Sequence, residues 1–89
     1  MAWKIELSKQ ARRDLKNISH ENRKRIARFI DERLSTLDDP RAIGKSLSGK
    51  RFKDIWAYRI GDYRLLVNIE DEVMTILVLQ INHRREVYR

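Results

Sequence analysis

The residues best suited to chemistry lie in the second half of the chain, and the first of them is Arg64. It lies between Tyr63 and Leu65 inside a predicted strand. Partial burial of a charged side chain there costs free energy, which favours a functional role for the charge. A guanidinium group binds phosphate oxygens through two parallel hydrogen bonds and stays charged at any physiological pH. Arg64 is therefore a candidate ligand for a phosphate group.

The C-terminal segment adds groups that transfer protons. An imidazole acts as an acid or a base near neutral pH, which makes His83 a candidate. A phenol ordinarily has a pKa of about 10, too high for a good base at neutral pH, but nearby cations favour the phenolate. Tyr88 has such neighbours in Arg84, Arg85 and Arg89. The sequence leaves open which of these groups would remove a proton.

Metal and thiol chemistry have little support in the sequence. The chain has no cysteine, and its two histidines, His20 and His83, lie in opposite halves. Asp, Glu and His residues with the spacing of a metal site are also lacking. We therefore expect no metal and no cofactor, so that any site would depend on Arg, Tyr, Lys and His.

The charge of the chain indicates what kind of partner it binds. Twenty Lys and Arg oppose thirteen Asp and Glu in 89 residues, which leaves a formal net charge of +7. Such an excess favours an anionic partner, either a nucleic acid or an acidic protein. Hydrophobic residues make up 42% of the chain, enough for the core of one small domain, which we expect to span residues 1–89.

The N-terminal residues Met1–Leu7 lack the apolar run of a signal peptide. No segment reaches the roughly 18 apolar residues of a membrane span. The absence of cysteine also suits a reducing compartment. We therefore expect a cytoplasmic protein with no membrane partner.

The first 40 residues indicate a strand followed by a helical hairpin. Apolar and charged side chains alternate from Trp3 to Leu7, as in a half-buried strand. Ser8 and Ser19 stand where helix N-caps belong, and each precedes apolar residues at helical spacing. Pro40 ends the second helix, because the residue before a proline avoids the helical conformation.

The second half indicates a basic loop over residues 41–53, followed by strands. These are predicted over Ile55–Ile60, Tyr63–Ile69 and Val73–Ile81, with Gly61-Asp62 as a hairpin turn. The order β-α-α-β-β-β predicts an α+β fold, an antiparallel four-stranded sheet with a helical hairpin packed on it. The first strand is expected at an edge or beside the last strand.

Two stretches of the sequence resemble the RelE/ParE superfamily of bacterial toxin–antitoxin systems, and the RelE branch in particular. They are the run Ile60-Gly61-Asp62-Tyr63-Arg64-Leu65-Leu66-Val67 and the ending His83-Arg84-Arg85-Glu86-Val87-Tyr88-Arg89. The segment 39–47 also resembles the family's loop after the helical hairpin. The likeness covers nearly the whole chain and implies the RelE-like fold.

The resemblance implies a toxin of a type II toxin–antitoxin system. RelE toxins are cytoplasmic, metal-independent endoribonucleases (mRNA interferases) that cleave mRNA in the ribosomal A site, inhibit translation and arrest growth. Arg64 is then similar to the family arginine that binds the scissile phosphate, and Arg84 or Arg85 to the arginine that assists it. Tyr88 is similar to the tyrosine that stacks on a base or joins in proton transfer, and His83 to the histidine of one large subset.

Metal-free RNA cleavage uses the ribose 2′-hydroxyl as the nucleophile. It needs a base for that proton, cations that stabilise the phosphate and an acid for the leaving oxygen. Further basic residues would bind RNA or the ribosome, namely Lys45, Lys50, Arg51, Lys53, Arg59 and Arg89. The implied partners are the ribosome and mRNA, a RelB-like acidic antitoxin, and operator DNA through that antitoxin.

The sequence departs from the family at one point. The best-known members carry two lysines at alternate positions before the Tyr-Arg block, where this chain has Ile55 and Ala57. Two alternatives therefore stay open: a ParE-like toxin that inhibits DNA gyrase, and a catalytically inactive module that binds RNA or protein. The missing lysines favour the gyrase alternative, whereas the C-terminal arginines and Tyr88 argue against it.

Overall fold

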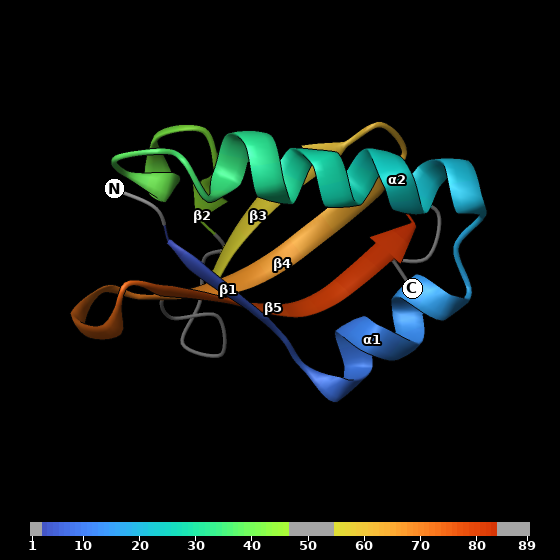
Figure 1. The fold of residues 1–89 in the computed structure, drawn as a ribbon, viewed down its shortest axis with the longest axis horizontal. Coiled ribbons are helices and arrows are strands. Elements are labelled where there is room, and N and C mark those ends of the chain that lie inside the picture. Colours follow the sequence, from blue (N-terminus) through green and yellow to red (C-terminus); the bar gives the residue numbers. More distant parts are fainter. Residues whose placement is uncertain (1–2, 47–54, 84–89) are drawn as a thin grey trace.

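Five strands and a helical hairpin make up the part of the chain that the computed structural model describes, residues 3–46 and 55–83. The elements follow in the order β1 (Lys4–Leu7), α1 (Lys9–Lys16), α2 (His20–Arg28), η1 (Phe29–Leu34), η2 (Pro40–Ala42), β2 (Lys45–Ser46), β3 (Ile55–Ile60), β4 (Tyr63–Glu70), η4 (Asp71–Val73) and β5 (Thr75–His83). η1 is a π-helical continuation of α2, and η2 and η4 are short 3-10 turns. Both helices lie across the same face of the sheet (Figure 1).

The strands lie in the order β1-β5-β4-β3-β2. β2 to β5 pair antiparallel with their neighbours, whereas β1 runs parallel to β5, with Ile5 opposite Ile76. The α+β class and the place of the first strand, at an edge beside the last strand, are confirmed. The expected four antiparallel strands are wrong in two details, because β2 lies within the predicted loop and β1 is parallel. Apolar and polar residues alternate in the same way in parallel and antiparallel strands, so the sequence could not show that β1 runs parallel to its neighbour.

Ser8 fixes the start of α1 against the sheet. Its hydroxyl oxygen accepts a hydrogen bond from the Ala11 amide at 3.0 Å, as predicted for an N-cap. The same hydroxyl donates to the Leu79 carbonyl at 2.7 Å. Leu79 is the extra residue of a β-bulge, where the register of β4 and β5 shifts after Leu66. The helix start is therefore tied to the bulge.

The second helix changes its winding halfway. Ser19 caps α2 by accepting a hydrogen bond from the Asn22 amide, as predicted. From Phe29 the helix continues as the π-helical segment η1, in which the Ser35 amide bonds to the Ile30 carbonyl at 2.9 Å. The predicted apolar stripe lies in the core, where its most buried members are Ile26, Ile30 and Leu34.

The core fills the space between the helices and one face of the sheet. Leu65, Val67 and Ile69 of β4 point into it and are at most 4% exposed. Side chains alternate along a strand, so the residues between them lie on the opposite face, which we call the open face. On β4 the open face carries Arg64, Leu66 and Asn68.

The two turns of the meander differ in how well the sequence predicts them. Gly61 has a φ of 58°, which confirms the predicted hairpin turn between β3 and β4. The second turn is the 3-10 turn η4, which is followed by Met74 with a φ of 46°, although the last strand was predicted to begin already at Val73. β5 therefore begins at Thr75 and extends to His83, two residues beyond the predicted end.

Candidate functional site

Two arginines face each other across the β3–β4 hairpin. Arg59 of β3 lies directly opposite Arg64 of β4 in the register of the two strands. Side chains at such positions start about 5 Å apart on the same face of a sheet, and like charges there destabilise the pairing. An anion bound between the two guanidinium groups would relieve that repulsion. The pair is therefore suited to hold a phosphate on the open face.

The neighbouring strand β5 adds amide groups to this face. Asn82 lies opposite Arg64, and its side-chain amide donates a hydrogen bond to the Gln80 side chain at 3.1 Å. Asn68 lies on the same face of β4. Sequence reasoning missed these amides, although Gln80 and Asn82 stand out as alternating polar positions at the end of an apolar strand. They supply donors and acceptors beside Arg64.

His83 lies on the other face of the sheet. It is opposite Tyr63, and the two rings meet edge to face with centroids 5.2 Å apart. Together with Asp14 and Asn17 near the end of α1, both rings line a cleft of about 420 Å³. The structure thus does not bring His83 to the same face as Arg64, although the two residues are close in the register.

Lys45 is the remaining predicted site residue that the structure describes. Lys45 is exposed on β2, opposite Ala57. The following lie outside the described residues: Lys50, Arg51, Lys53, Arg84, Arg85, Tyr88 and Arg89.

The two positions where the best-known relatives carry lysines belong to the open face. Ile55 lies opposite Asn68 and Ala57 opposite Leu66, so both share a face with Arg64. These side chains are apolar and cannot act as a base or bind a phosphate charge. The replacement of the two lysines by Ile55 and Ala57 therefore makes the sheet surface near Arg64 apolar rather than cationic.

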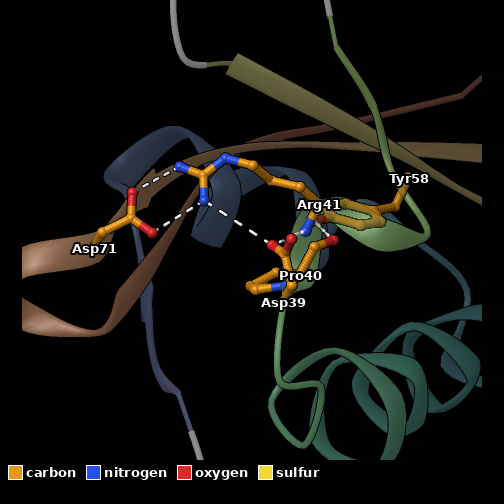
Figure 2. A network of polar contacts seen from close by, with 5 residues as sticks. All are labelled: Asp39, Pro40, Arg41, Tyr58 and Asp71. Carbon is orange, nitrogen blue, oxygen red and sulfur yellow. Dashed lines mark hydrogen bonds and ion pairs between the residues drawn. The ribbon is translucent and has the colours of Figure 1, made fainter.

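A network of polar contacts fixes the chain segment that leads to the basic loop (Figure 2). The Arg41 guanidinium forms two hydrogen bonds to Asp71, of 2.9 and 2.7 Å, and approaches Asp39 at 4.0 Å. The buried Tyr58 hydroxyl donates to the Pro40 carbonyl at 2.6 Å. The segment from Asp39 to Arg41 is thus joined both to β3 and to the turn before β5.

The same network shifts two pKa values. Hydrogen bonds from Arg41 are the main cause that lowers the pKa of the exposed Asp71 carboxyl below its ordinary value of 3.8. Burial raises the pKa of Tyr58 to about 12, partly offset by the charge of Arg41. Tyr58 is therefore an uncharged, structural hydrogen-bond donor at neutral pH rather than a base.

The described residues show neither a metal site nor a membrane-spanning helix. No group of three or more His, Asp or Glu residues within 3–46 and 55–83 is arranged to hold a metal ion. In the same part of the chain, no helix is long and apolar enough to cross a membrane. What the described residues do offer is an open sheet face with two opposed arginines and several amides.

Comparison with known proteins identifies the class. The sequence model of a family described as the ParE toxin of the type II toxin–antitoxin system parDE matches residues 5–88. The chain belongs to the RelE/ParE family of toxins from type II toxin–antitoxin systems. A particular relative is the toxin RelG of Mycobacterium tuberculosis, which is 32% identical over 89 residues, covering 100% of this chain and 99% of the relative.

Solved structures show the same fold. The toxin–antitoxin complex RelBE2 from Mycobacterium tuberculosis contains a chain that is 30% identical, with a TM-score of 0.84 over 94% of this chain and 100% of that one. A chain in the archaeal RelE-RelB complex from Pyrococcus horikoshii is 22% identical, with a TM-score of 0.73 over 98% and 100% of the two chains. The RelE-like fold expected from the sequence is thereby confirmed.

Proposed function

We propose that this toxin is a ribosome-dependent endoribonuclease that cleaves mRNA in the A site and stops translation. The observation that carries the proposal is the direct opposition of Arg59 and Arg64 on the open face, with Asn82 on the next strand. Two guanidinium groups and an amide match the oxygens of a phosphodiester. The helices cover the other face (Figure 1), so among the described elements the open face is the one left for a strand of RNA.

The proposed reaction needs no metal. Arg64 binds the scissile phosphate and stabilises the charge that develops on it when the ribose 2′-hydroxyl attacks. As the bond between phosphorus and the 5′-oxygen breaks and a 2′,3′-cyclic phosphate forms, Tyr88 passes the 2′-hydroxyl proton to the departing 5′-oxygen. Arg84 and Arg85 favour the Tyr88 phenolate and assist Arg64. Arg84, Arg85 and Tyr88 follow shortly after His83, the last residue of β5, which is one register position from the partner of Arg64.

The basic residues outside the cleavage site are assigned to RNA and ribosome binding. Lys45 is exposed on β2, and Lys50, Arg51, Lys53 and Arg89 follow in segments of the same charge. Salt would weaken such contacts strongly, because binding releases counterions from the RNA backbone.

The proposed partner that restrains the toxin is a RelB-like acidic antitoxin. Two observations support it: the solved relative from Mycobacterium tuberculosis belongs to a toxin–antitoxin complex, and this chain has a net charge of +7. Opposite charge speeds association and suppresses wrong partners. The antitoxin and the toxin would both lie in the cytoplasm. The DNA-binding part of the antitoxin would hold the complex on operator DNA.

A second candidate function, inhibition of DNA gyrase, is favoured by one observation. Ile55 and Ala57 make the open face apolar where the best-known ribonucleases of the family carry lysines. A gyrase inhibitor would have no need of those lysines. The same expression experiment separates the two candidates.

The test is to express the full chain from a tightly repressed promoter and to follow labelled methionine and thymidine incorporation. Cleavage of mRNA predicts that methionine incorporation falls first, and primer extension on ribosome-bound mRNA then shows new 5′ ends within codons. Earlier loss of thymidine incorporation would identify the gyrase inhibitor instead. Unchanged growth at a verified protein level would contradict both and favour an inactive binding module.

A further inference from the structure

The strand β1 forms one end of the sheet, and no further strand of the described residues pairs with its outer edge. β1 lies beside β5 (Figure 1), and the Lys4 amide donates at 2.9 Å to the Met74 carbonyl, just before that strand. The preceding amide, of Trp3, donates instead to the Ser35 carbonyl at 2.8 Å. Polar backbone groups of successive residues point to opposite edges of a strand, so those of Ile5 face outward, away from β5. β1 thus presents an N–H and a C=O group at the open end of the sheet.

An apolar groove lies between this edge and the helical hairpin. Its volume is about 270 Å³. The lining comes from β1, both helices and η1, and consists mainly of aliphatic side chains: Ile5, Leu7, Leu15, Ile26, Ala27 and Ile30. The two that belong to β1, Ile5 and Leu7, are only half-buried. An open strand edge next to exposed apolar surface is a typical site for pairing with another chain.

The charges along this edge nearly cancel. Lys4 and Glu6 are exposed at alternate positions of β1 and form an ion pair of 3.3 Å. Asp31 is the one charged residue of the groove lining. The formal charge of the three is therefore −1, in a chain whose net charge is +7. RNA and an acidic protein segment would gain no electrostatic attraction here, so the edge suits a strand that itself carries both signs of charge.

The sequence of β1 is complementary to itself when two copies run antiparallel. With Ile5 of each copy on a twofold axis, Lys4 of one copy lies opposite Glu6 of the other, and this pair occurs twice. The two Ile5 residues then exchange hydrogen bonds through their outward N–H and C=O groups. Moving the axis to Glu6 would place two carboxylates directly opposite each other, which disfavours that register.

We propose that the toxin without antitoxin forms a weak symmetric dimer, in which β1 pairs antiparallel with β1 of a second copy and Ile5 lies on the twofold axis. The two sheets then form one continuous sheet, and the second copy adds its Ile5 and Leu7 side chains beside the apolar groove. Both open faces lie on the same side and stay uncovered, because this axis is perpendicular to the sheet. The inference is independent of the proposed RNA cleavage.

The first test exchanges charges across the dimer axis and measures association of the full-length toxin by sedimentation equilibrium. Short paired strands bury little area and each copy carries +7, so we expect a dissociation constant of about 0.01–1 mM. Lys4→Glu and Glu6→Lys should each weaken association at least tenfold, because each places like charges opposite each other. An equimolar mixture of the two variants should restore it, since every opposite pair in the mixed dimer again has opposite charges. Lys24→Glu makes the same charge change at an exposed position of α2 and should not weaken association.

The second test measures the register with a single disulfide. The chain has no cysteine, so one introduced thiol reports only on contact between two copies. In Ile5→Cys the two Cα atoms on the axis would lie about 5.5 Å apart, which a disulfide can bridge. Leu7→Cys is the matched control, because four residues of offset separate its two copies by about 14 Å. Under mild oxidation we expect a covalent dimer of Ile5→Cys on a non-reducing gel and little of it for Leu7→Cys.

Three outcomes would overturn the inference. The first is a parent toxin that stays monomeric up to about 1 mM; weaker antitoxin binding by Lys4→Glu would in that case assign the edge to the antitoxin. The second is a mixture of Lys4→Glu and Glu6→Lys that associates no better than either variant alone. The third is equal cross-linking of Ile5→Cys and Leu7→Cys, which would contradict an axis at Ile5. Translation arrest by the parent, measured separately, shows whether the proposed ribonuclease function stands in each case.

Discussion

Arg41 binds Asp71 through both of its terminal guanidinium nitrogens, at 2.9 and 2.7 Å, and so joins residues thirty positions apart (Figure 2). Arg41 belongs to the turn η2 and Asp71 to the turn η4, so the pair links the chain before the basic loop to the turn before β5. The Arg41 guanidinium also lies 5.9 Å from the centroid of the Trp56 ring. Its side chain is only 29% exposed, whereas that of Asp71 is 60% exposed.

Asp71→Asn is expected to lower the melting temperature at neutral pH. The hydrogen bonds from Arg41 lower the pKa of the folded-state carboxyl below 3.8, so its stabilising contribution is present above that pH and is lost as the pH falls below it. Melting curves at about pH 7 and about pH 2.5 should therefore show a difference from the parent only at the higher pH. Glu72→Gln removes a neighbouring exposed carboxylate and serves as control, and an equal effect of both variants would contradict the assignment.

Tyr58→Phe is expected to destabilise the fold by about 1–3 kcal/mol, because the buried Pro40 carbonyl loses its hydrogen-bond donor. The folded-state pKa of about 12 lies above the ordinary 10.0, so the contribution of the neutral phenol is intact below pH 10 and is lost as the pH rises toward 12. Urea unfolding of both proteins from neutral to alkaline pH measures this. Tyr63→Phe is the matched control, and a parent–variant difference that does not shrink at high pH would contradict the pKa assignment.

Local signals in the sequence were enough for the elements whose geometry depends on near neighbours. Ser8 and Ser19 cap the helices because their hydroxyls meet amides three residues later. Gly61 marks the hairpin because it readily adopts a positive φ. The pair Arg59 and Arg64 then follows from the length of the turn alone.

Features that depend on contacts between residues far apart in the sequence could not be predicted from local sequence signals. The face on which His83 lies is set by the register of β5 after the bulge at Leu79, inside a nearly continuous apolar run that shows no alternation. The Arg41–Asp71 ion pair joins two turns whose separation in space is fixed by the whole sheet. The closeness of Arg25 to Gly61 likewise exists only because the helix packs against the β3–β4 turn.

Gly61→Ala is expected to destabilise the protein by about 1–2 kcal/mol. Gly61 has a φ of 58°, and a Cβ in this left-handed region contacts the following carbonyl oxygen. Its nearest neighbour, a terminal nitrogen of Arg25, is flexible and adds little to the cost. Gly61→Asn, which tolerates the same backbone, should lose less. Chemical unfolding of the two variants measures the difference, and an asparagine variant as unstable as the alanine variant would point to contact with Arg25 rather than to backbone strain.

Arg64→Ala and Tyr88→Phe are expected to relieve toxicity while the protein still folds and binds its antitoxin. Arg64 lies on the open face, away from the core, so the variant is expected to fold. Arg64→Lys keeps the charge but loses the paired hydrogen bonds of a guanidinium, and should restore only part of the activity. We would measure cleavage of ribosome-bound mRNA, growth after induction and antitoxin binding for each variant. Full toxicity of both Arg64→Ala and Tyr88→Phe would show that the phosphate site lies elsewhere on the molecule.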